Sequence, residues 1–143
     1  MGEAVIAYLW VAMGGALGSM ARYGISIAAA RMWGSAFPWG TLIVNVLCSF
    51  IIGLFGTLTV SGGVLPASPG LRTFVMVGFC GGFTTFSSFS LQTLELARGR
   101  EGLSALANMV GSVVLCLVVV AAGYYVGSQI SAAARRPELD QRS

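Results

Sequence analysis

Residues 78–90 read GFCGGFTTFSSFS, and this stretch decides how the rest of the chain is interpreted. It contains three glycines, four phenylalanines and five hydroxyl side chains, and no charged residue. Its apolar surroundings predict a membrane helix, but glycine weakens a helix by roughly 1 kcal/mol per residue relative to alanine. We therefore expect a membrane-spanning helix that is broken near Gly81-Gly82.

The composition around this stretch is that of a membrane protein. The chain has 143 residues, of which 56% are hydrophobic and only 9% are charged, and its mean hydropathy is +0.84. Soluble domains are about a quarter charged, and about 20 apolar residues span a bilayer. The long charge-free runs predict an all-α domain over 1–134 with transmembrane helices at about 4–28, 39–60, 72–97 and 103–131, followed by a polar tail at 135–143.

The types of residue in the chain argue against a nucleic-acid partner and against a zinc site. All eight basic residues are arginines, and they form no cluster interleaved with aromatic residues, so a nucleic-acid partner is not expected. Cys48, Cys80 and Cys116 fall in three different predicted helices and lack CxxC spacing. Because the chain has no histidine to complete a ligand set, a zinc site is not expected either.

The arginines divide evenly between the two sides of the predicted helices. With both termini on one side, that side carries four and the opposite side carries four. The two groups are Arg72, Arg135, Arg136 and Arg142, and Arg22, Arg31, Arg98 and Arg100. An excess of arginine and lysine in the cytoplasmic loops normally fixes the orientation of a protein in the membrane. Either other features orient this chain, or it inserts both ways and two copies pair antiparallel.

Polar side chains recur at four-residue spacing inside two of the predicted helices. Thr41, Asn45 and Ser49 share one face of the second helix, since residues four apart are neighbours on a helix. The fourth helix carries the stripe Ser104, Asn108, Ser112 and Cys116. Such stripes serve either as interhelical hydrogen-bond contacts or as the lining of a polar path.

The predicted break in the third helix favours the second interpretation. A break frees backbone carbonyls at membrane depth, which is tolerated only in protein interiors or wet cavities, and such carbonyls often bind a cation in transporters. Beyond it, Phe86 and Phe89 share a face and serines surround them. Hydroxyl and amide donors, with the positive edges of aromatic rings, can replace part of the water shell of an anion. The residues thus indicate a path for a small anion or polar solute.

Three motifs resemble those of the Fluc (CrcB-type) fluoride channels. They are GGALGSMARYG (14–24), GTLIVNVLCSFIIG (40–53) and GFCGGFTTFSSFS, and the length and helix count also agree over nearly the whole chain. The resemblance implies an antiparallel, dual-topology homodimer in the inner (plasma) membrane. Such a dimer would have two pores and would passively export cytoplasmic fluoride.

The resemblance also implies roles for individual residues. Asn45 would donate to fluoride, and Phe86 and Phe89 would meet it through their ring edges. The carbonyls of Gly81 and Thr84 from both subunits would hold a central sodium ion. The rest of the polar track would be formed by Thr41, Ser87, Ser88, Ser112 and Cys116, with Arg22 near the aqueous vestibule.

Three residues depart from the family pattern. Cys48 stands where glycine is usual, Gln92 where many members have glutamate, and Cys116 where a hydroxyl residue would be the better donor. Cys48 puts in doubt the helix packing beside Asn45, and Gln92 puts in doubt an acidic role at the vestibule. Cys116 puts in doubt the last position of the polar track.

Three other classes of protein explain the sequence less well. A small drug–proton antiporter needs a carboxylate within the membrane, but Glu3 and Glu95 lie near helix ends. An accessory membrane subunit would explain the polar stripes but not the hydroxyl-rich third helix. An intramembrane enzyme would need an acid–base residue at mid-depth, so we expect no enzymatic activity.

Overall fold

Helices make up the fold, as the sequence predicts. The computed structural model describes residues 2–60 and 63–140, and this part of the chain contains helices and connecting segments but no strand. Four stretches are long and apolar enough to cross a membrane. They are α1 (Gly2–Trp33), α2 (Trp39–Thr59), a third span over Pro69–Arg98, and α6 (Gly102–Asp140). The predicted all-α architecture with four spans is confirmed.

Helices α1 and α6 are longer than the charge-free runs indicate. α1 continues to Trp33 and α6 to Asp140, because alanine-rich sequence at 28–30 and 132–134 sustains a helix beyond the apolar run. The backbone of 135–140, predicted as part of a polar tail, is therefore helical. The remaining tail residues, 141–143, lie outside the described residues.

The third span consists of four consecutive helical segments. These are α3 (Pro69–Arg72), the π-helical segment η1 (Thr73–Phe79), α4 (Cys80–Phe83) and α5 (Phe86–Arg98). Ser68 caps the start, since its Oγ accepts a hydrogen bond from the amide of Leu71 at 3.2 Å. At the other end of α3, Arg72 donates to the carbonyl and to the Oγ1 of Thr59, which ties this span to the end of α2.

The interruption in this span begins two residues beyond the predicted Gly81-Gly82, and the glycines themselves are helical. Gly81 and Gly82 lie inside α4, and the residues with extended backbone are Thr84 (φ −83°, ψ 160°) and Thr85 (φ −156°, ψ 113°). Gly82 serves close packing, because a Cβ at this position would collide with the backbone of Gly15 in α1. The threonines suit extended backbone because they are β-branched, and Thr85 also caps α5.

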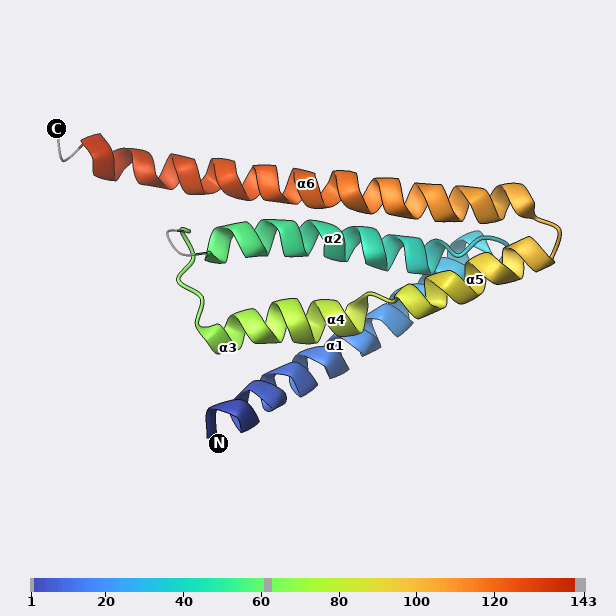
Figure 1. The fold of residues 1–143 in the computed structure, drawn as a ribbon, viewed down its shortest axis with the longest axis horizontal. Coiled ribbons are helices and arrows are strands. Elements are labelled where there is room, and N and C mark those ends of the chain that lie inside the picture. Colours follow the sequence, from blue (N-terminus) through green and yellow to red (C-terminus); the bar gives the residue numbers. More distant parts are fainter. Residues whose placement is uncertain (1, 61–62, 141–143) are drawn as a thin grey trace.

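Two pairs of glycines with GxxxG spacing bring helices together within the chain. Gly14 and Gly18 lie against the backbone of η1 and α4, where a Cβ would meet the carbonyls of Phe74 and Phe79. Gly123 and Gly127 likewise lie against α2 and let α6 run alongside it (Figure 1). Small residues that permit such close approach are typical of membrane helix pairs.

The chain termini and the connections between helices lie at the two ends of the molecule, with a small core between them. Both termini and the α2–α3 connection lie at one end, and the α1–α2 and α5–α6 connections lie at the other (Figure 1). Between them is a small buried cluster of Val44, Cys48, Cys80 and Phe83, whereas the outward faces of α1 and α6 expose many large apolar side chains. A small core with an apolar exterior is suited to a bilayer, where lipid covers that exterior.

Candidate functional site

Asn45 holds the interruption between α4 and α5 in place. Its Oδ1 accepts a hydrogen bond from the backbone N–H of Thr85 at 3.1 Å. In an uninterrupted helix this N–H would bond to the carbonyl of Gly81. The Thr85 side chain in turn accepts from the N–H of Ser88 at 3.2 Å, which would otherwise bond to the carbonyl of Thr84. Among the described residues, the carbonyls of Gly81 and Thr84 therefore lack their helical partners.

A cavity of about 280 Å³ lies next to this interruption. It is bounded by α2, the Thr84–Thr85 segment, α5 and α6, and no charged side chain lines it. Its lining residues are Asn45, Ser49, Thr84, Thr85, Phe86, Phe89, Ser112, Val113 and Cys116. The structure thus brings together five of the predicted pathway residues, namely Asn45, Phe86, Phe89, Ser112 and Cys116.

Phe86 and Phe89 have very different exposure in the single chain. Their ring centroids are 5.4 Å apart and their planes are tilted by 43°. The Phe89 side chain is 8% exposed, whereas that of Phe86 is 78% exposed. One ring is therefore part of the interior and the other forms the open edge of the cavity.

The first turn of α5 gives the cavity a positive end. The first N–H groups of any helix have no carbonyl partner within it, and the aligned peptide dipoles add partial positive charge there. Phe86 and Ser87 occupy this turn. Ser87 and Ser88, which were predicted to line the path, instead interact through their Oγ atoms with the Oγ1 of Thr85, at 3.2 and 3.1 Å, and are not among the cavity-lining residues.

A chain of hydrogen bonds links α6 to α5 behind the cavity. Ser112 Oγ donates to Oδ1 of Asn108 at 3.4 Å, and Asn108 Nδ2 donates to Oγ1 of Thr93 at 2.8 Å. Thr93 Oγ1 donates to the carbonyl of Phe89 at 2.7 Å. Asn108 is 1% exposed, so the polar stripe on α6 acts here as an interhelical contact as well as a cavity wall.

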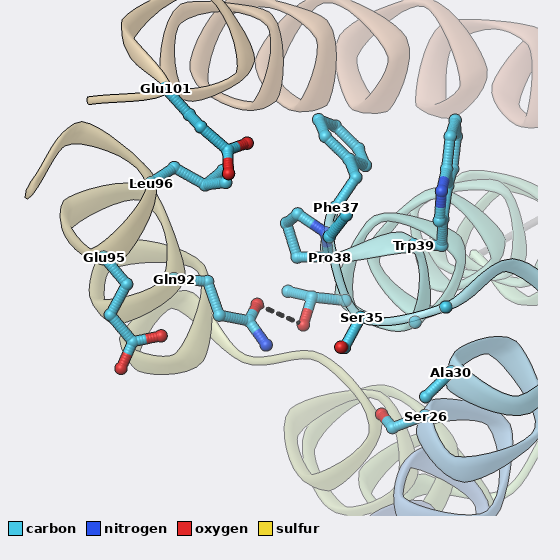
Figure 2. Close-up of a pocket in the computed structure, with 14 residues that line it drawn as sticks. Ser26, Ala30, Ser35, Phe37, Pro38, Trp39, Gln92, Glu95, Leu96 and Glu101 are labelled. Atoms are coloured by element: carbon cyan, nitrogen blue, oxygen red, sulfur yellow. Dashed lines mark hydrogen bonds between the residues drawn. The ribbon is translucent and has the colours of Figure 1, made fainter. Parts of the chain in front are cut away.

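Thr41 lies in a second cavity, at the end of the bundle that carries the α1–α2 and α5–α6 connections. This cavity measures about 360 Å³. Gln92, Glu95 and Glu101 border one side of it, and Ser35 and Phe37 from the α1–α2 connection lie opposite (Figure 2). Polar and acidic side chains thus line this cavity at one end of the bundle.

A hydrogen bond joins Thr41 and Gln92, which both line this second cavity. Thr41 Oγ1 donates to Gln92 Oε1 at 2.7 Å. Thr41 is one helical turn before Asn45 on α2, and Gln92 is about one turn after Phe89 on α5. This neutral polar pair in the wall of the second cavity is thus one helical turn from Asn45 and Phe89, which line the first.

Arg22 is found away from both cavities. Its Nε donates to the carbonyl of Gly82 at 3.2 Å, and Ser19 Oγ donates to the same carbonyl at 3.4 Å. The side chain is half-buried between α1 and α4, and it lines neither the cavity of Thr41 nor that of Asn45. In the single chain, Arg22 anchors the backbone just before the interruption, and its predicted place near the vestibule stays a prediction.

Sequence analysis did not assign Thr85 or Thr93 to the site, and it named Gln92 only as a departure from the family pattern. Thr85 could have been suspected, because threonine is one of the residues preferred at the N-cap of a helix. Gln92 is three residues after Phe89 and thus on the same helical face. The partnership of Asn108 with Thr93 joins two helices and leaves no local signal in the sequence.

Known proteins are similar in sequence to this chain over most of its length. Residues 9–124 match the family described as CrcB-like protein, Camphor Resistance (CrcB). The chain is 52% identical over 118 residues to the Fluoride-specific ion channel FluC of Methylobacterium radiotolerans, which is 82% of either chain. It is 56% identical over 117 residues to the protein of the same name in Opitutus terrae, covering 82% of this chain and 89% of that protein. Since the match spans well over half of its residues, this chain belongs to the CrcB-like family.

Proposed function

We propose that this protein is a channel that conducts fluoride passively across the cell membrane. The observation that carries the proposal is the uncharged cavity between α2, α5 and α6, which brings Asn45, Phe89 and Ser112 together at the first turn of α5. Relatives about half identical to the chain are named fluoride-specific ion channels. The four spanning helices and the family make the chain a multi-pass protein of the cell membrane.

The chemistry of this cavity favours a small anion that accepts hydrogen bonds strongly. Asn45 uses Oδ1 for Thr85, which leaves its Nδ2 group as a donor. The N–H groups at the start of α5 and the positive edge of the Phe89 ring point to the same preference. Because no charged side chain lines the cavity, nothing would hold an anion so tightly that it could not leave, as conduction requires.

The exposed edge of the cavity supports assembly with a second copy. Phe86 is 78% exposed, and a Cβ at Gly81 would meet no atom within 4 Å. We propose that a second chain covers this side. The even division of arginines allows both orientations in the membrane, so the two chains would be antiparallel. Each chain would then contribute one cavity, giving two pores for each dimer.

The residues present also fit a structural sodium ion at the interruption. The carbonyls of Gly81 and Thr84 lack their helical partners among the described residues, and a hard cation prefers oxygen ligands of this kind. These two carbonyls would hold the ion, together with the same pair from the second copy. The ion would supply fixed positive charge and satisfy carbonyls that otherwise remain unbonded at membrane depth.

Transport through such a path would follow the fluoride gradient. No carboxylate lines the cavity beside Asn45, so the site lacks the group that a proton-coupled transporter uses. A cell that has accumulated fluoride would lose it through the channel, which would relieve toxicity.

Purified protein in liposomes tests this proposal. Liposomes loaded with potassium fluoride should release fluoride within seconds to minutes when a potassium ionophore provides counter-ion flow, and chloride-loaded liposomes should not. The fluoride is measured with a selective electrode, and protein-free liposomes are the control. Equal release of both anions, or of neither, would refute the proposal.

A further inference from the structure

Two buried cysteines lie together in the core, away from the cavities. Cys48 is on α2 and Cys80 is the first residue of α4. Their side chains are 2% and 3% exposed and belong to one buried cluster. Cys48 Sγ donates to the carbonyl oxygen of Cys80 at 3.7 Å. Two thiols from separate helices thus share one site.

The side chains that surround this pair are all apolar and include no hard ligand. Val44 and Phe83 complete the buried cluster, and the partly buried side chains packed against it are Ala21, Ile25, Ile51, Ile52 and Phe79. Within the described residues, no group of three or more acidic, cysteine or histidine side chains could hold a metal ion. Zinc, which takes four ligands in structural sites, is therefore unsuited to this site. Thiolates are soft ligands, so a soft ion that needs only two of them suits this pair.

Charge decides which soft ion the site can take. A charged group in an apolar interior costs far more free energy than a neutral one. Two thiolates with a monovalent ion such as copper(I) leave one negative charge in the cluster. Two thiolates with a divalent ion leave none. The apolar surroundings therefore favour a divalent soft metal.

We propose that Cys48 and Cys80 form a two-thiol site for a soft divalent metal ion of the mercury(II) class. In the binding step, one Hg²⁺ and two thiols give Hg(SCys)₂ and two protons, so that two sulfur–metal bonds form, two S–H bonds break and no electron is transferred. The bound metal bridges α2 and α4. Cys116 takes no part, because it lies at the cavity between α2, α5 and α6.

The first test counts bound metal. The purified full-length protein is incubated with mercury(II) chloride, washed with an excess of a monothiol and analysed for mercury per chain. The wild type and Cys116→Ser should retain one mercury atom per chain, and Cys48→Ser and Cys80→Ser should each retain at least tenfold less. Equal retention by Cys48→Ser and the wild type, or no retention by the wild type, would overturn the proposal.

A second measurement separates a bridge from attachment to single thiols. A ligand that bridges two helices of the native state raises the thermal midpoint of unfolding. Mercury should therefore raise the midpoint of the Cys116→Ser protein and leave that of Cys48→Ala unchanged. A decrease in the first, or an equal increase in both, would show that no bridge forms. Neither measurement depends on fluoride conduction, so this inference can fail while the proposed function stands.

Discussion

Asn45→Asp separates the structural role of this side chain from its role toward the anion. The aspartate retains an oxygen that can accept the hydrogen bond from the N–H of Thr85, which Asn45 accepts at 3.1 Å. It replaces the Nδ2 donor with negatively charged oxygen. We therefore expect the variant to fold and assemble as the wild type does but to lose fluoride conduction.

The size of the effect follows from the position of Asn45 in the cavity wall. Two like charges about 4 Å apart repel each other by about 4 kcal/mol at an effective dielectric constant of about 20. Each 1.4 kcal/mol or so is tenfold in an equilibrium constant, so occupancy by fluoride should fall about a thousandfold. Fluoride release from liposomes should fall to the rate of protein-free liposomes.

The assay compares Asn45→Asp with Asn45→Ala at mildly alkaline pH, where the carboxyl group is ionised. The alanine variant removes the acceptor and leaves the N–H of Thr85 without a partner, which costs about 1–3 kcal/mol. It should therefore have a lower thermal midpoint than the aspartate variant. If Asn45→Asp released fluoride at the wild-type rate, Asn45 could not face the anion, and the assignment of this cavity as the path would be wrong.

Three further substitutions test separate parts of the structure. Phe86→Ile should abolish fluoride release, because it removes positive ring edges from the open edge of the cavity. Fluoride release at the wild-type rate would show that the ring is not part of the path. Asn108→Leu should lower the free energy of unfolding by about 1–3 kcal/mol, since it leaves Thr93 and Ser112 without their shared partner; an unchanged denaturation midpoint would contradict this. Gly18→Leu should prevent stable folding, because the new side chain would meet the backbone at Phe79. Gly24→Ala is the control, because a Cβ at Gly24 meets no atom within 4 Å. The two variants are compared by size-exclusion chromatography, and an equal yield of folded protein would refute the packing argument.

Charge-free runs were sufficient to predict the four spans. A charged residue within the bilayer is costly, so the positions of Arg22, Arg72 and Glu95 limit which part of each helix can lie in the apolar interior of the bilayer. The positions of the charged residues do not predict where each helix begins and ends. Outside the bilayer no penalty stops an alanine-rich helix, and α6 accordingly continues to Asp140.

The position of the interruption was not predictable from glycine propensity. The destabilisation of roughly 1 kcal/mol for each glycine is small compared with what packing can contribute, and Gly82 is needed where α4 meets Gly15 of α1. The interruption occurs instead at Thr84 and Thr85, where Asn45 takes the N–H of Thr85. That contact joins residues forty positions apart, and no local pattern indicates it.

The single hydrogen bond between Asn45 and Thr85 produces both halves of the proposed site. By accepting the N–H of Thr85, Asn45 leaves the carbonyl of Gly81 without its helical partner, which creates negative character on the α4 side. Because the same bond ends α4, a new helix can begin at Phe86 with its positive end toward the cavity. The proposed cation site and the proposed anion path would therefore both lie at this one interruption, and they share Thr84. Loss of the Asn45 acceptor should therefore weaken both together, even though the side chain contacts only one of them.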